Sequence, residues 1–209
     1  YRDVWLITTD APEIRQWKAC ALLDPAGTTG RVVFEGTFVK VEPSQAETLA
    51  SLQVLDPSGM VVVEKSLSCH WEEGVCSINE TLELNEPQLW YPRGYGEQPL
   101  YKARLRLLRE GRELDRCNKQ IGFRHLEVSP RFEVKVNGHS IKLWGASWTS
   151  PEGRSKRHFR EHLLKTLDMV ENANMVTLRI WGPGAPYDEE IYDECDRRGI
   201  LTWAEFFHT

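Results

Sequence analysis

A change of hydrophobic pattern near Pro130 divides this chain into two parts. Up to residue 128, apolar and polar residues alternate in short runs separated by turn sequences, and no stretch of helical periodicity is long enough to compete. Beyond Pro130, runs of helical periodicity alternate with short apolar runs. The pattern therefore predicts a β-domain followed by an α/β-domain.

The first part is typical of an antiparallel β-sandwich. Asp24-Pro25-Ala26-Gly27 and Asp56-Pro57-Ser58-Gly59 each place proline at the second position of a turn, where its fixed φ is favourable. We expect strands at residues 4–9, 15–23, 31–41, 49–55, 60–67, 75–84, 100–108 and 113–128, the last in one piece or two. This number and spacing of strands predict an immunoglobulin-like β-sandwich over residues 11–128.

The second part predicts parallel β/α units. Apolar residues recur at steps of four, four and three along 159–170, which indicates a helix over about 155–172, and capping residues predict a second helix over 188–198. A hairpin turning at Asn137-Gly138 precedes apolar strands at 141–148, 175–181 and 200–207. Strands buried on both sides and separated by helices indicate the first three units of a TIM (β/α)₈ barrel, over residues 129–209.

A doubly wound open sheet is the competing fold for this second part. We find no glycine-rich phosphate turn after any of its strands, which favours the barrel. Three barrel strands cannot close and would leave an exposed apolar edge. We therefore expect the chain to be a piece of a larger protein.

The charge balance and the hydropathy exclude two classes of partner. The chain holds 31 acidic residues against 26 Lys and Arg, a net charge of −5, so it lacks the basic surplus that binds phosphate backbones. No apolar run approaches the roughly 20 residues of a membrane span. We expect neither nucleic acid nor a membrane as a partner.

The cysteines leave the cellular compartment open. The five cysteines show no C-x-x-C spacing, and although Cys69 and Cys76 could face each other across a hairpin, single buried thiols are an equally ordinary interpretation. Asn79-Glu80-Thr81 is a glycosylation triplet only if the chain is secreted by a eukaryote. We expect no metal and no cofactor, because no third ligand accompanies the histidines at suitable spacing, namely His125, His139, His158 and His162.

Candidate binding residues follow from the barrel prediction, because sites in such barrels form at the carboxyl ends of the strands. Tryptophan, arginine and carboxylate together suit a sugar, since indole faces stack on pyranose rings while charged groups bond to hydroxyls. An arginine in an apolar strand also needs a carboxylate partner. The candidate substrate-binding residues are Trp148, Glu152, Arg179, Trp181 and Glu205.

Each candidate also has a purely structural interpretation. The tryptophans could be core aromatics, Arg179 could form a structural ion pair, and Glu205 could cap the loop that follows it. The chain contains no set of nucleophile and base, and Glu152 with Glu205 is not a convincing pair of catalytic carboxylates. We therefore expect no catalytic residue within this chain.

A set of ordered motifs resembles glycoside hydrolase family 2, in its β-mannosidase branch. The longest is Leu89-Trp90-Tyr91-Pro92-Arg93-Gly94-Tyr95-Gly96-Glu97-Gln98-Pro99-Leu100-Tyr101. The others, in chain order, are Ile121-Gly122-Phe123-Arg124, Val136-Asn137-Gly138, Gly145-Ala146-Ser147-Trp148, Arg179-Ile180-Trp181-Gly182 and Tyr192-Asp193-Glu194-Cys195-Asp196 followed by Gly199-Ile200-Leu201. The resemblance spans about Tyr1 to Thr209.

The resemblance implies a retaining exo-glycosidase that cleaves terminal β-D-mannosides. Its acid/base and nucleophile glutamates would lie beyond Thr209, so this fragment alone would be inactive, and residues 1–10 would be the exit strand of a preceding jelly-roll domain. The five candidate substrate-binding residues would form the wall of the sugar subsite, and the partners would be a β-mannoside-containing glycan and the remaining domains of the parent enzyme.

Four departures from the family pattern leave the sugar open. Ser147 stands where the family usually has Asn, Glu152 where it has Asp, Gly182-Pro183-Gly184 where it has three glycines, and Ala204 where it has Gln. The alternatives are an exo-β-glucosaminidase, a β-galactosidase or an endo-β-mannosidase of the same family. A degenerate relative without activity and a non-catalytic carbohydrate-binding or scaffold module are further alternatives.

Overall fold

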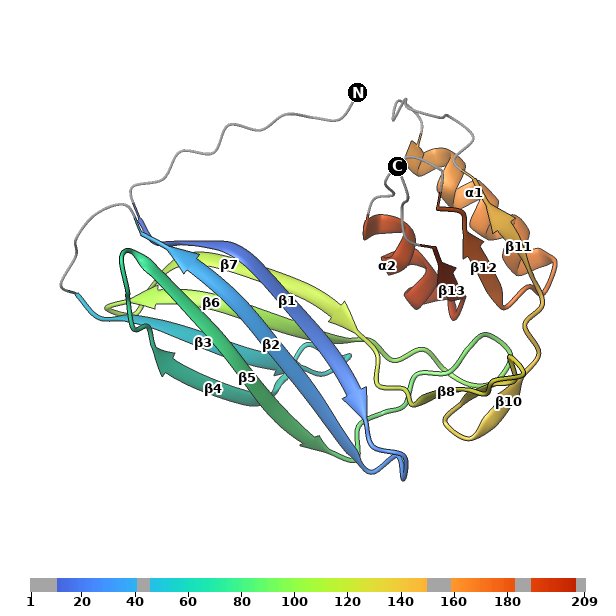
Figure 1. Cartoon of the computed structure of the whole chain (residues 1–209), viewed down its shortest axis with the longest axis horizontal. Coiled ribbons are helices and arrows are strands. Elements are labelled where there is room, and N and C mark those ends of the chain that lie inside the picture. Colours follow the sequence, from blue (N-terminus) through green and yellow to red (C-terminus); the bar gives the residue numbers. More distant parts are fainter. Residues whose placement is uncertain (1–10, 41–45, 150–158, 183–188, 206–209) are drawn as a thin grey trace. The chain divides into compact units, whose positions relative to one another are not determined.

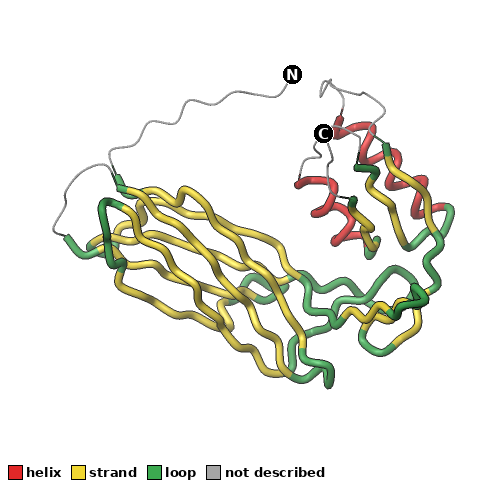
Figure 2. The backbone as a smooth tube through the Cα atoms, in the orientation of Figure 1, coloured by secondary structure: helices red, strands yellow, loops and turns green. Residues whose placement is uncertain are grey.

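The structure, a computed structural model, describes residues 11–40, 46–149, 159–182 and 189–205 (Figure 1). It forms two compact units. The sandwich unit comprises Leu6–Leu89 and Pro99–His125, and the α/β unit contains Trp90–Gln98 and Leu126–Thr209. Figure 2 shows that, among the described residues, helix occurs only in the α/β unit. The expected strand at 4–9 and the expected jelly-roll exit strand at 1–10 lie outside the described residues.

The sandwich unit consists of two antiparallel sheets. One has the order β1-β2-β5, and the other has the order β4-β3-β6-β7. The strands of the first sheet are β1 (Glu13–Leu23), β2 (Thr29–Val39) and β5 (Val75–Asn85). Those of the second are β3 (Thr48–Leu55), β4 (Val61–Ser68), β6 (Tyr101–Arg109) and β7 (Arg112–Ile121). All seven correspond to predicted strands.

Alternation along these strands places the core between the two sheets. Phe34 and Phe38 of β2 and Leu52 of β3 are fully buried, as are Leu105 and Leu107 of β6. The two predicted proline turns also form, because the amide of Gly27 donates to the carbonyl oxygen of Asp24 at 2.9 Å and Gly59 does the same to Asp56. Inward apolar side chains, rather than hydrogen bonding alone, thus determine which face of each strand is buried.

The cysteines of this unit are thiols in the structure. Cys69 and Cys76, which could have formed a disulfide across the hairpin, are both free. Both pack against the sandwich core, and burial, with Cys76 beside it, raises the pKa of the Cys69 thiol to about 12.

The α/β unit contains a small antiparallel sheet and a parallel sheet. The antiparallel sheet has the order β10-β9-β8, with β8 (Leu126–Val128), β9 (Val134–Val136) and β10 (His139–Ile141). The parallel sheet has the order β11-β12-β13, with β11 (Gly145–Trp148), β12 (Thr177–Ile180) and β13 (Leu201–Ala204). Its strands are joined through α1 (Phe159–Asn172) and α2 (Glu189–Arg198).

The two helices cover one face of the parallel sheet. Leu163 and Leu167 of α1 and Ile191 of α2 are fully buried, and they pack with Leu178 and Ile180 of β12. The apolar spacing that predicted the first helix therefore marks its buried stripe. The expectation that the strands are buried on both sides is wrong for β11 and β13, whose residues 145–147 and 202–204 are exposed.

The predicted strand at 141–148 is interrupted in the structure. β10 ends at Ile141 and β11 begins at Gly145, because the backbone turns between them, where the Trp144 amide donates to the Lys142 carbonyl. The Trp144 carbonyl then accepts from the amides of Val176 and Thr177 at 2.8 and 3.2 Å. A Cβ on Gly145 would lie 2.0 Å from the Thr177 carbonyl oxygen, so only glycine permits this close approach.

One segment from between β5 and β6 belongs to the α/β unit. In this Trp90–Gln98 segment, the Trp90 indole is fully buried and its Nε1 donates to the Asp196 carbonyl at 2.7 Å. The amide of Arg93 donates to the Gly199 carbonyl at 2.8 Å, and its Nη1 lies 3.0 Å from Glu171 Oε1. The segment is thus bonded to the ends of both helices.

Among the helices that the structure describes, none is long and apolar enough to span a membrane.

Candidate functional site

The parallel sheet has two chemically different faces. Its register aligns Ser147 of β11 with Arg179 of β12 and Trp203 of β13, so these three side chains lie on one face. The next row, Trp148 with Ile180 and Ala204, lies on the opposite face, which α1 and α2 cover. We call the first of these the open face.

Arg179 and Glu205 form the polar centre of the open face. Arg179 Nε donates to Glu205 Oε1 at 2.7 Å, and Nη2 of the same guanidinium also contacts that carboxylate. Arg179 Nη1 donates to Ser147 Oγ at 3.3 Å, which ties the guanidinium to β11 as well. The prediction that Arg179 needs and finds a carboxylate partner is confirmed.

Glu205 also fixes the turn at the end of β12. Its Oε2 accepts a hydrogen bond from the Gly182 amide at 3.1 Å, and its own amide donates to the Ile180 carbonyl at 3.1 Å. Both carboxylate oxygens are therefore engaged by groups of this chain. Such a carboxylate suits positioning and charge balance better than attack on a substrate.

The structure does not bring Trp148 to this pair. The Trp148 ring is 4% exposed and packs in the helix-side core, and its Nε1 has no hydrogen-bond partner among the described residues. Trp181 follows β12 and is 39% exposed, and its amide donates to the Trp148 carbonyl at 3.3 Å. Glu152 lies outside the described residues, so its predicted role stays a prediction.

Two aromatic rings that the sequence did not single out as a pair lie on the α/β unit. Phe132 and Trp203 stack with their ring centroids 5.5 Å apart and their planes at 29°. Both are exposed, by 63% and 49%. Phe132 has a φ of +63°, an unusual conformation for a bulky residue, in a turn where its amide donates to the Ser129 carbonyl. No local pattern in the sequence marks this contact.

The open face presents both polar groups and apolar surface. It combines the guanidinium of Arg179, the hydroxyl of Ser147 and a carboxylate with the exposed ring of Trp203. A pyranose has hydroxyls for the first groups and a C–H face for the ring. Among the described residues, no group of three or more His, Cys, Asp or Glu side chains is placed to hold a metal ion.

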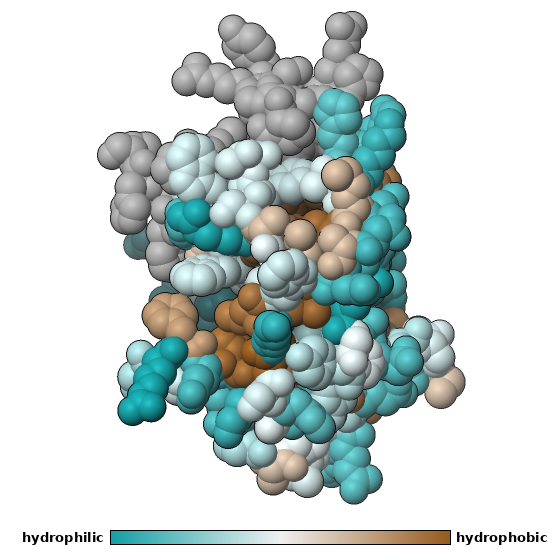
Figure 3. Space-filling view, turned by 90° about the vertical axis from the view of Figure 1, so that its right-hand side faces the viewer, coloured by the Kyte–Doolittle hydropathy of each residue, from teal (hydrophilic) through white to brown (hydrophobic). Residues whose placement is uncertain are grey.

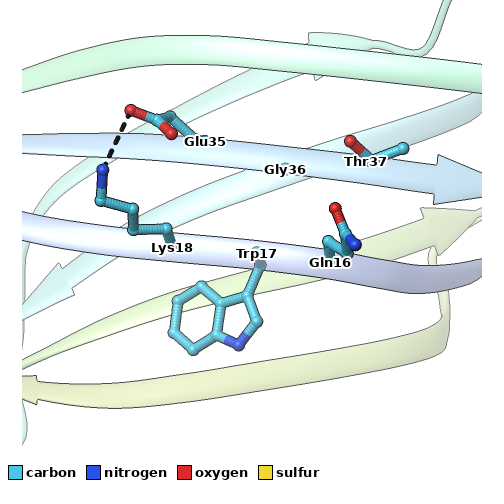
Figure 4. A pocket seen from close by; sticks show the side chains of 6 residues that line it. All are labelled: Gln16, Trp17, Lys18, Glu35, Gly36 and Thr37. Carbon is cyan, nitrogen blue, oxygen red and sulfur yellow. Dashed lines mark hydrogen bonds and ion pairs between the residues drawn. The ribbon is translucent and has the colours of Figure 1, made fainter. Parts of the chain in front are cut away.

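A separate pocket of about 450 Å³ lies on the outer face of the sandwich unit (Figure 4). Gln16 and Thr37 stand on one side of it, and Lys18 and Glu35 stand on the other, with 3.5 Å between Lys18 Nζ and Glu35 Oε1. The Trp17 indole points away from these four side chains, toward the core. The pocket therefore offers hydrogen-bonding groups but no ring on which a sugar could stack.

Comparison of the sequence with known families matches more than half of the chain. Residues 13–124 match the sequence profile of a family described as Glycosyl hydrolases family 2. The chain is 30% identical over 176 residues to Beta-mannosidase B of Aspergillus fumigatus, a match that covers 81% of this chain and 20% of that protein. It is 34% identical over 132 residues to Beta-mannosidase B of Thermothelomyces thermophilus, covering 59% and 15%. The chain spans about a fifth of the length of these curated relatives.

Solved structures resemble nearly the whole chain. The Beta-D-Mannosidase of Dictyoglomus thermophilum superposes with a TM-score of 0.76 and 26% identity, over 93% of this chain and 24% of that one. A Parabacteroides merdae Beta-Glucuronidase superposes with a TM-score of 0.77 and 20% identity, over 93% and 24%. The second match, at this identity, shows the fold alone.

Proposed function

The chain belongs to family 2 of the glycosyl hydrolases, and from this premise we propose that it is a central part of a retaining enzyme that removes terminal β-D-mannosyl residues from glycans. The observation that carries the proposal is the 30% identity to a β-mannosidase over 176 residues, because that match extends beyond the family profile into the α/β unit. No cofactor is part of this proposal, since glycoside hydrolysis in such enzymes uses two carboxyl groups.

We propose that the sandwich unit is an immunoglobulin-like domain. Its seven strands divide three and four between two sheets, and the chain crosses between the sheets after β2, β4 and β5. We further propose that β11, α1, β12, α2 and β13 are the beginning of a TIM barrel, which their parallel register and the covering of one face by helices support. The sequence predicted domain limits of 11–128 and 129–209, whereas residues 90–98 and 126–128 belong to the α/β unit, so we propose that the boundary between the two domains follows His125.

Within this barrel, the open face would form part of the sugar subsite. Arg179 and Ser147 would donate to and accept from hydroxyls, while Glu205 holds the guanidinium in place through Nε and Nη2. Trp181 and Trp203 would supply apolar surface, since both are exposed. Substrate roles for Trp148 and Glu152 stay predictions. The two catalytic glutamates would lie outside these 209 residues.

The proposal is tested with the full-length parent enzyme and a panel of aryl β-glycosides. We expect hydrolysis of the β-mannoside to exceed that of the β-glucosaminide, β-galactoside and β-glucuronide by at least tenfold in kcat/KM, and the released sugar to keep its β configuration. Preference for another glycoside would overturn the mannosidase assignment, and an inverted product would overturn the retaining mechanism.

The same enzyme tests the subsite. Arg179→Lys keeps the positive charge but loses the forked geometry, and we expect it to lower kcat/KM for the β-mannoside by about tenfold or more. Lys165→Arg, on the exposed surface of α1, is the matched control and should leave kcat/KM unchanged. Measurable glycan binding by the sandwich unit, with no hydrolysis by the parent enzyme, would favour a binding module instead.

A further inference from the structure

The triplet Asn79-Glu80-Thr81 lies in the middle of β5 of the sandwich unit. It is the one place in the sequence where an asparagine is followed two positions later by serine or threonine. Because side chains alternate along a strand, Asn79 and Thr81 point to the same side, and both are exposed. We propose that Asn79 accepts an N-linked oligosaccharide when this chain is made in a eukaryotic secretory pathway.

The sandwich core determines which side of β5 faces the solvent. Cys76 and Leu82, on the opposite side of the strand, are each only 4% exposed and belong to the core between the sheets. A shift of register by one residue would exchange the buried and the exposed sides of β5. Burial of Cys76 and Leu82 therefore keeps the Asn79 side chain on the solvent side. The folded strand therefore presents the acceptor amide without any change in the core.

The surface around Asn79 has room for a sugar ring. Its cross-strand neighbour on β2 is Glu35, whose carboxylate turns toward Lys18 of β1 (Figure 4). The four residues that flank this pair on the same face are small, namely Ser77, Thr81, Val33 and Thr37. A first N-acetylglucosamine attached to Asn79 would thus lie over short side chains.

The position of β5 gives the modification a structural consequence. β5 stands at one end of the sheet order β1-β2-β5 (Figure 1). The next residue, Glu80, reaches from β5 to Lys65 of β4, with 2.7 Å between Lys65 Nζ and Glu80 Oε2. An oligosaccharide on Asn79 would stand beside the outer edge of β5 and hinder the addition of a strand from another molecule.

The modification is a group transfer from a lipid-linked donor. The amide nitrogen of Asn79 forms a bond to C1 of the first N-acetylglucosamine, while the bond between C1 and the lipid pyrophosphate breaks. The pyrophosphate leaves with the electron pair, and the amide loses one proton. Thr81 supplies the hydroxyl that the oligosaccharide transferase recognises in the triplet.

The test expresses the full chain behind a cleavable secretion leader in eukaryotic cells. We expect a slower-migrating form that peptide N-glycosidase converts to the unmodified size, with aspartate at position 79 in the recovered peptide. Asn79→Gln and Thr81→Ala should each abolish the slower form, whereas Thr81→Ser should keep it. Asn85→Gln, at an asparagine of the same strand outside any triplet, is the matched control and should also keep it.

Folding is checked separately, because the two substituted side chains are exposed and should not affect the core. The same variants made in bacteria should unfold within about 0.5 kcal/mol of the unsubstituted chain. A folded chain that enters the secretory pathway and carries no glycan at Asn79 overturns the proposal. This readout involves no hydrolytic activity, so it is independent of the proposed enzymatic function.

Discussion

At the scale of single residues, the sequence predicted an ion pair but not the faces of all the aromatic side chains. A guanidinium in an apolar strand is costly unless a carboxylate meets it, so the partner of Arg179 followed from elementary electrostatics, and Glu205 is that partner. Ser147, not Trp148, is aligned with Arg179 in the sheet. Because adjacent residues of a strand point to opposite faces, the Trp148 ring packs on the face that the helices cover. The composition of a strand end does not reveal which of two adjacent residues lies on the open face and which lies on the face that the helices cover.

The ion pair between Arg179 and Glu205 should contribute measurably to stability. We expect a double-mutant cycle of Arg179→Ala and Glu205→Ala to give a coupling free energy of about 1 kcal/mol, because the pair is partly buried and hydrogen bonded. The measurement is urea unfolding followed by helical circular dichroism, which reports the α/β unit because the described helices belong to it.

The exposed pair of Lys165 and Glu161 on α1 is the control for that cycle. Its side chains are 66% and 59% exposed and sit four residues apart, so we expect a coupling of about 0.3–0.5 kcal/mol. Equal couplings for the two pairs would contradict a special role for the contact between Arg179 and Glu205.

At the scale of elements, local periodicity predicted most strands and helices, and long-range contacts explain the exceptions. The hairpins of the sandwich follow from turn residues and alternation, which act over a few positions. The break at 142–144 instead depends on a carbonyl that bonds to β12, more than thirty positions away in the chain. The contacts of the Trp90–Gln98 segment with the helix ends are equally non-local. The apolar residues of this segment follow neither the period of a strand nor that of a helix, so its position could not be predicted from the sequence.

An ion-pair network links this segment to both helices. Arg198 of α2 lies 2.7 Å from Asp168 and 2.8 Å from Glu171 of α1, measured from its Nη1. Glu171 also contacts Arg93 of the segment. Gly199, directly after α2, adopts a φ of +71°. Its carbonyl oxygen accepts a hydrogen bond from the amide of Arg93. The end of α2 therefore depends on glycine at this position.

Gly199→Ala should disrupt the docking of the segment. A Cβ there would lie 2.6 Å from the Arg93 amide nitrogen, so strain and overlap together should lower the free energy of unfolding of the α/β unit by about 3 kcal/mol. Gly94→Ala is the matched control, because Gly94 has a similar φ of +79° and its Cβ would meet no atom within 4 Å among the described residues.

For the control we expect a loss of about 1 kcal/mol, the cost of the left-handed conformation alone. Chemical denaturation followed by helical circular dichroism measures both variants. A Gly199→Ala variant no less stable than Gly94→Ala would show that the close approach to Arg93 is not required.

At the scale of the whole molecule, several large apolar side chains of the α/β unit are exposed to solvent. Trp144, Phe132, Met169 and Trp203 are each about half exposed or more. Figure 3 shows one face of the molecule, on which patches of brown apolar surface lie between polar side chains. The sequence predicted an exposed apolar edge because three parallel strands cannot close into a barrel, and of these four side chains only Trp203 lies on β13, at one end of the sheet order. It could not indicate which aromatic rings would be left on the surface.

This surface should make the 209-residue chain associate with itself. We expect sedimentation velocity to show a weight-average mass that rises with concentration, and the combined variant Phe132→Ser and Trp203→Thr to reduce that rise. Met60→Ser is the control, since Met60 is 66% exposed on a turn of the sandwich unit and should not alter association. A mass independent of concentration would contradict the expectation.

The Trp90–Gln98 segment also matters for protein engineering with this family. In the sequence the segment lies between β5 and β6 of the sandwich unit. In the structure it belongs to the α/β unit, where the indole of its Trp90 is fully buried. A chimera that imports the sandwich of a relative by crossing over at the ends of that domain would exchange these nine positions as well, and would pair foreign residues with the native helix ends. Crossovers at Leu89 and Pro99 would keep this segment together with the helix ends that it contacts.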